Sequence, residues 1–174
     1  LDSKSIHEEV LKSMYNHIAD LVEEHADEKE KISEDNLKEI IEYINSNLLK
    51  QKLTEEELKD KDIDALINYI YKKVVGEYEE KIKELPEEIT EEFEKVITLN
   101  IIDKYWMEQI NTMSHLREGI VLRQYAQDNP LRAYTEEGFA LFDKMLENID
   151  KNITIYLLKA EIRQNIERKE VVKP

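Results

Sequence analysis

Helix-breaking residues are scarce in this chain, and their positions constrain its fold more than any other feature. Among 174 residues there are three glycines and three prolines, the residue types that most often interrupt helices. Gly119 and Pro130 lie in the stretch 116–134, where Asp128 and Asn129 offer cap and turn side chains just before the proline. Long segments with helical patterns flank this stretch. We therefore expect a short tip between two helical arms, and we look for function there.

The two arms carry apolar residues at helical spacing. The first begins at Pro86, has acidic residues in its first turn, and meets no breaker before Gly119. At 1.5 Å per residue, this arm spans about 45 Å. The second arm is expected to continue to about Arg168, and two long consecutive helices with a short connection pack antiparallel. The predicted stripes are Phe93, Val96, Ile97, Ile101, Tyr105, Ile110, Met113, Leu116 and Ile120, then Phe139, Phe142, Met145, Leu146, Ile149, Ile153, Tyr156, Leu157 and Ala160.

The first 85 residues have helical patterns too. One helix is expected from about Ser5 to His25, followed by an acidic link and a second helix capped by Ser33 or Asp35. Thr54-Glu-Glu-Glu57 fits a capping box, and a last helix should end before Pro86. No alternating strand pattern of useful length appears. The predicted fold is all-α, with long helices, a projecting antiparallel hairpin and a small helical subdomain between residues 27 and 85.

Composition limits the classes of protein that this chain can belong to. It has no cysteine, which excludes disulfides and thiolate metal sites. No apolar run approaches the roughly 20 residues of a membrane-spanning helix, so we expect a cytosolic protein. Residues 1–100 carry 28 acidic and 14 basic side chains, against 12 and 11 in residues 101–174. The acidic half should repel phosphate backbones, so we expect no nucleic-acid partner.

The sequence gives little support for catalysis. It has neither a glycine-rich phosphate loop nor a His-Glu-x-x-His pair. Of the four histidines, His17 and His25 lie on one predicted helix but eight residues apart, too far to share one metal ion. A helical enzyme with a metal site at some of the four histidines, which also include His7 and His115, is a second alternative. We expect no catalytic residue and no metal ligand here.

Aromatic and basic residues near the tip are the stronger candidates for function. Tyr125 follows the last residues of the first arm, where a tyrosine offers amphipathic contact area at small entropy cost. In the functional interpretation Tyr125 projects from the tip. In the alternative interpretation it folds back and packs against the arms. Arg117 and Arg123 are either contact residues or solvated arm residues. Trp106, the only tryptophan, is expected to be buried by packing, and the alternative is a joint with another domain.

The same region resembles the SecA family, the ATPase motors of bacterial preprotein translocation. The order of segments fits the helical scaffold and helical wing of that family along essentially the whole chain. On this resemblance, residues 1–26 are part of a scaffold helix, residues 27–85 are the wing, and residues 86–174 continue the scaffold with a two-helix finger whose tip is about 122–134. The matching motifs are Ile102-Asp103-x-x-Trp106, Met113-x-x-Leu116-Arg-x-Gly119-Ile-x-Leu122-Arg-x-Tyr125-x-Gln127, Pro130-Leu131-x-x-Tyr134, Phe139 and Met145-Leu146.

The resemblance implies a moving part of a motor rather than a complete enzyme. ATP and Mg²⁺ belong to nucleotide-binding domains elsewhere in the parent protein, which is cytoplasmic and associates peripherally with the membrane through the SecY channel. The finger meets that channel and the preprotein, and it restrains ATP turnover until both engage. The implied tip residues are Gln124, Tyr125, Ala126, Gln127, Asp128, Asn129, Pro130 and Leu131, with Tyr125 touching substrate. The implied channel or motor contacts are Trp106, Arg117, Arg123 and Arg132.

Two questions stay open at the level of sequence. An all-helical adaptor that docks a protein partner, with no motor activity, would show the same long arms and exposed tip. A SecA relative, for its part, is either a housekeeping motor or an accessory one with a narrower set of substrates. The chain starts at a leucine and enters a helical pattern almost at once, so we expect an excised fragment.

Overall fold

The computed structural model describes residues 2–123 and 129–161, and within these ranges the fold is all-α, as predicted. The described residues contain six helices and no strand. The helices are α1 (Ser3–Glu24), α2 (Glu34–Asn47), α3 (Glu55–Leu58), α4 (Ile63–Lys83), α5 (Glu87–Arg123) and α6 (Pro130–Lys159).

Local cap chemistry sets where most of these helices begin. The Ser33 side chain accepts from the backbone N–H of Asn36 and caps α2. The predicted capping box at Thr54 is confirmed, since the Glu57 carboxylate accepts from the Thr54 backbone N–H at 2.8 Å. Side-chain oxygens of Asp2, Asp62 and Asn129 cap α1, α4 and α6 in the same way. Each cap satisfies a backbone donor that a helix start leaves without an intrahelical partner.

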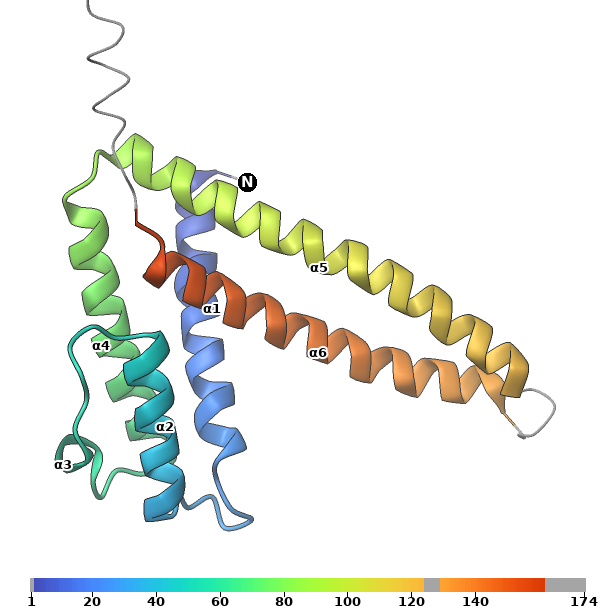
Figure 1. Ribbon diagram of the computed structural model, residues 1–174, viewed down its shortest axis with the longest axis horizontal. Helices are drawn as coiled ribbons and strands as arrows, with labels where there is room; N and C mark the ends of the chain where they lie inside the picture. Colours follow the sequence, from blue (N-terminus) through green and yellow to red (C-terminus); the bar gives the residue numbers. More distant parts are fainter. Residues whose placement is uncertain (1, 124–128, 162–174) are drawn as a thin grey trace, which may run out of the picture.

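The helices form a bundle from which a long hairpin extends (Figure 1). α1 and α4 lie side by side, while α2 and α3 cover the end of the bundle farther from the hairpin. α5 and α6 lie side by side and antiparallel, and both cross the upper part of α1. The far end of the pair reaches well beyond the other helices.

A single hydrophobic core connects the bundle to the base of the hairpin. Val10 and Met14 of α1, Val74 of α4, and Ile153 and Leu157 of α6 are all at most 2% exposed and belong to one cluster. Because this cluster includes residues from all three predicted segments, the base of the hairpin is packed into the bundle rather than tethered to it. The divisions after residues 26 and 85 remain predictions.

Gly119 does not end the first arm, and the second arm ends earlier than the sequence predicts. α5 continues through Gly119 to Arg123, because one glycine weakens a helix by only about 1 kcal/mol relative to alanine. The prediction that the second arm continues past Ala160 is wrong. α6 ends at Lys159, and Ala160 has extended backbone with ψ of 133°.

Candidate functional site: the helical hairpin and its base

Most of the predicted tip lies outside the described residues. This holds for Gln124, Tyr125, Ala126, Gln127 and Asp128. Asn129 caps α6, with its side-chain oxygen 3.1 Å from the backbone nitrogen of Arg132. Pro130 and Leu131 open the first turn of α6, and Leu131 is 73% exposed.

The predicted arginine contacts lie along the outer half of the hairpin. Arg117 is exposed on α5 and lines a shallow cleft beside Trp106 and Tyr134. Arg123 is the last residue of α5. Arg132 Nε donates to the carboxylate of Glu136 one turn further along α6, at 2.9 Å. An exposed ion pair of this kind contributes only a few tenths of a kcal/mol, which leaves the Arg132 guanidinium available to a partner.

The face of α5 that turns inward is more polar than the predicted stripe. Glu94, Thr98 and Gln109 are at most 9% exposed, whereas Val96 and Ile110 of that stripe are 44% and 63% exposed. The stripe is therefore wrong at these two positions. The apolar residues of α5 occur on every side of the helix, so their spacing does not identify the side that packs on the bundle.

The outer side of α5 forms an exposed apolar face. Exposed large apolar side chains gathered on one side of a helix have the character of a contact surface. Its exposed large apolar residues are Ile89, Val96, Leu99, Trp106, Met107, Ile110, Val121 and Leu122.

Trp106 is the most informative residue of this outer face. The expectation that packing buries it is wrong, because Trp106 is 44% exposed. One side of its ring contacts Phe142 of α6 at a centroid distance of 6.0 Å. Trp106 also lines a cleft of about 280 Å³ together with Met113, Arg117 and Tyr134. A rigid aromatic side chain held this way, half packed and half open, is typical of an interface anchor.

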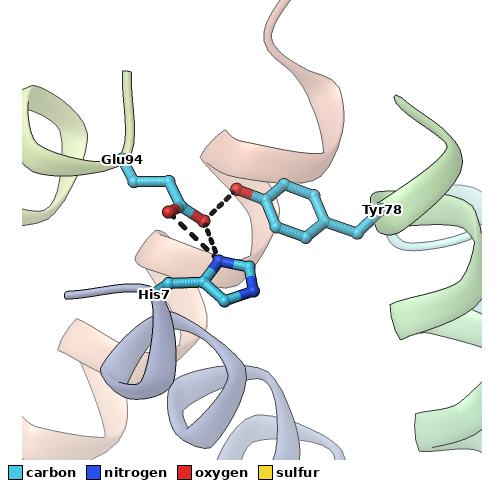
Figure 2. A network of polar contacts seen from close by, with 3 residues as sticks. All are labelled: His7, Tyr78 and Glu94. Atoms are coloured by element: carbon cyan, nitrogen blue, oxygen red, sulfur yellow. Dashed lines mark hydrogen bonds and ion pairs between the residues drawn. The ribbon is translucent and has the colours of Figure 1, made fainter. Parts of the chain in front are cut away.

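A buried carboxylate joins three helices at the base of the hairpin (Figure 2). Glu94 of α5 is only 2% exposed. Its carboxylate accepts from the Tyr78 hydroxyl of α4 at 2.7 Å and lies 2.8 Å from Nδ1 of His7 of α1. Burial and the Glu94 carboxylate raise the pKa of Tyr78, so its hydroxyl stays protonated and donates. These contacts supply the donors that a buried charge requires.

A second polar contact at the base holds the end of α6. Lys81 of α4 donates from Nζ to the backbone carbonyls of Leu157 and Leu158, at 2.7 and 3.0 Å. Burial lowers the pKa of Lys81. The ammonium donates to carbonyl groups in the last turn of a helix, where a positive charge is favourable. The contact thus joins α4 to the last turn of α6, which ends at Lys159.

The histidines do not gather into one site. Whereas His7 contacts Glu94, His17 lies 2.7 Å from the Tyr43 hydroxyl. His25 pairs with Glu39 through Nε2, while Nδ1 donates to a backbone carbonyl, and His115 lies near Glu118. Across residues 2–123 and 129–161, no three histidine, aspartate or glutamate side chains are grouped so that they could hold a metal ion.

Sequence reasoning did not find Glu94, Tyr78 or Lys81. Glu94 lies in an acidic run that has the composition of a solvated face, and its partners are 16 and 87 residues away. The available signal was the spacing of Glu94, Thr98, Tyr105 and Gln109, which follows one side of a helix as closely as the apolar stripe does.

Together these features define a class of protein, a helical bundle that presents a long helical hairpin with exposed apolar side chains on its outer face. None of the described helices is both long enough and apolar enough to cross a membrane. The family model of the SecA wing and scaffold domain matches residues 1–161. The chain belongs to this family, and it is therefore a wing and scaffold part of the protein-translocation machinery.

Proposed function

We propose that this chain is the lever of a SecA motor, which couples ATP hydrolysis in the parent protein to movement of a preprotein through the SecY channel. The observation that carries the proposal is the long hairpin, in which the 37-residue α5 and the antiparallel α6 are packed into the bundle at one end only. Paired long helices transmit a displacement with little bending. The match to the SecA wing and scaffold domain supports the same interpretation.

The tip between the two arms is the part that meets the substrate in this proposal. Tyr125 contacts the moving preprotein, because an aromatic ring with one hydroxyl can pack against an extended chain of any sequence. The neighbouring residues from Gln124 to Leu131 shape the tip, and Arg117, Arg123 and Arg132 are the basic groups available to the channel. The parent protein would then work in the cytoplasm and reach the membrane through the channel.

The outer face of α5 would contact the nucleotide-binding domains of the same motor. Trp106 and its exposed apolar neighbours supply a surface for such a contact. ATP and Mg²⁺ would bind in those domains, and the hairpin would restrain their turnover until channel and preprotein engage. On this proposal the chain alone hydrolyses no ATP.

Site-specific crosslinking from position 125 of the full-length motor, during stalled export, tests the proposal. We expect a photoreactive residue there to label both the preprotein and the channel, and the same residue at Lys38 of α2 to label neither. Tyr125→Ala should slow preprotein movement without loss of helical content, while Tyr125→Phe keeps the ring and most of the rate. Normal transport by Tyr125→Ala would remove the tip from the mechanism.

The second candidate function is an adaptor that docks a protein partner on the hairpin and has no motor. The exposed apolar face of α5 favours it, since such a face fits any protein partner. The parent reading frame separates the two candidates. A motor must contain a G-x-x-x-x-G-K-[ST] phosphate loop in the nucleotide-binding domains that would precede this chain.

A further inference from the structure

One turn of α4 holds both arms of the hairpin. Tyr78 donates to Glu94 near the start of α5, and Lys81, three residues further along, donates to the last turn of α6. Residues at this spacing lie on the same side of a helix. The two arms are thus fixed at their bases to neighbouring side chains of one element.

Both contacts are polar and directional, and the Tyr78–Glu94 contact is buried while the Lys81 contact is partly buried. Tyr78 is fully buried, Glu94 is 2% exposed, and Lys81 is half-buried. A buried carboxylate or ammonium keeps its place only where its partners satisfy it, so these groups cannot slide past one another as apolar side chains can. His7 adds a third point of attachment, because it lies within 2.8 Å of the same carboxylate from α1.

The length of the arms converts a small rotation at the base into a large displacement at the far end. From Glu94 to the end of α5 at Arg123 there are 29 residues, or about 44 Å of helix. A rotation of about 5° at the base therefore moves the far end by about 4 Å on this helical rise. The direction in which the hairpin points depends on how firmly its base is held.

We propose that Tyr78 and Lys81 of α4 form a two-point polar joint, which sets the direction of the α5–α6 hairpin relative to the small helical subdomain. Tyr78 holds α5 through Glu94, and Lys81 holds α6 through the carbonyls of Leu157 and Leu158. A rotation of α4 then turns both arms together. This joint is a property of the chain itself, and it holds whether the hairpin serves a motor or an adaptor.

The absence of cysteine from the sequence makes a distance measurement direct. Cysteines replace Glu42 on α2 and Asn111 on α5, both exposed, and each receives a spin label. Pulsed dipolar spectroscopy then gives the distribution of distances between the subdomain and the arm. The measurement uses the whole chain, with no channel, nucleotide or preprotein.

Two variants each remove one point of the joint. Tyr78→Phe keeps the ring and removes the hydroxyl that Glu94 accepts, and its control is Tyr71→Phe on the same helix. Lys81→Met keeps the apolar stem and removes the ammonium, and its control is Lys83→Met, where the side chain is exposed. We expect each joint variant to broaden the distance distribution and the double variant to shift its maximum by several ångströms, while both controls match the parent chain.

An unchanged distribution in a folded double variant would overturn the joint. If the double variant does not fold, His7→Ala replaces it, since His7 is only partly buried and its loss removes one donor from Glu94. Broadening in His7→Ala but not in His115→Ala supports the joint, and equal distributions in the two contradict it. This test measures no transport, so its outcome does not depend on the proposed role in export. In the same way, failure of the joint would leave the proposed role in export untouched.

Discussion

The Tyr43 hydroxyl lies 2.7 Å from Nε2 of His17 and connects α2 to α1. Burial, with a smaller effect of Lys151, lowers the pKa of His17 to about 4, and burial with a smaller effect of Glu24 raises that of Tyr43 to about 12. At neutral pH the imidazole is therefore uncharged, and the hydroxyl keeps its proton. The hydroxyl donates and the imidazole nitrogen accepts, in a contact that protonation of His17 would disrupt.

Because of this contact, we expect the free energy of unfolding to fall in acid. The unfolded chain binds a proton at His17 below about pH 6.5, whereas the folded chain does so only near pH 4. The contribution of His17 is therefore complete above pH 6.5 and is lost as the pH falls to about 4, by up to about 3 kcal/mol. Urea unfolding at pH 7.5 and 4.5 measures the difference. His17→Gln, which still accepts from Tyr43, should reduce it, and the exposed His115→Gln should leave it unchanged.

The effect of Asp20 on stability should have the opposite pH dependence to that of His17. Burial, then the charges of Glu147 and Asp150, with Glu23 and Glu24 after them, raise its pKa to about 6. Between about pH 4 and 6 the folded chain holds a proton there that the unfolded chain has released, so stability falls as the pH rises through this range. At pH 7 Asp20 carries an unfavourable charge.

Asp20→Asn removes that charge and should stabilise the chain at pH 7. After allowance for the screening of a partly exposed group, the expected gain is about 1 kcal/mol. Little gain is expected at pH 3.5, where the aspartate is mostly protonated in both states. Thermal and urea unfolding at the two pH values check this, with exposed Asp103→Asn as the control. A gain of equal size at both pH values would mean that packing, not charge, causes it.

Features fixed by local chemistry were predictable from the sequence. The cap at Ser33 and the capping box at Thr54 depend on residues three positions apart, and both occur as predicted. The antiparallel order of two long helices follows from their length and their short connection. These features depend only on residues near one another in the chain.

Features fixed by distant contacts were not predictable. Whether Glu94 is solvated or buried depends on His7 and Tyr78, which helical periodicity does not bring together. The last turn of α6 contacts Lys81, which lies 76 residues before Leu157. Apolar residues occur on every side of α5, so their spacing could not show that Trp106 lies on an exposed side.

Glu77 should control the order of the connection between α2 and α3. Its two carboxylate oxygens accept from the backbone N–H groups of Lys50 and Gln51, at 2.8 and 2.9 Å. Glu77→Ala leaves these donors to water and should destabilise the connection by about 1 kcal/mol, which is the typical net contribution of one hydrogen bond. Amide hydrogen exchange of Lys50 and Gln51 should become several times faster. The exposed Glu79→Ala, two residues away, should leave both rates as they are.

Trp106 should report on the docking of a partner against the outer face of α5. As the only tryptophan, it gives the whole intrinsic indole fluorescence, and it is 44% exposed. If the nucleotide-binding domains of the motor cover this face, as we propose, adding them should shift the emission to shorter wavelength and reduce its quenching by iodide.

Trp106→Ala should weaken that binding by at least about 30-fold, the effect of losing an aromatic anchor of about 2 kcal/mol. Phe139→Ala, on α6 and exposed, is the control for a general loss of apolar surface. Equal losses in the two variants would mean that the partner reads apolar area along the hairpin and not the ring of Trp106.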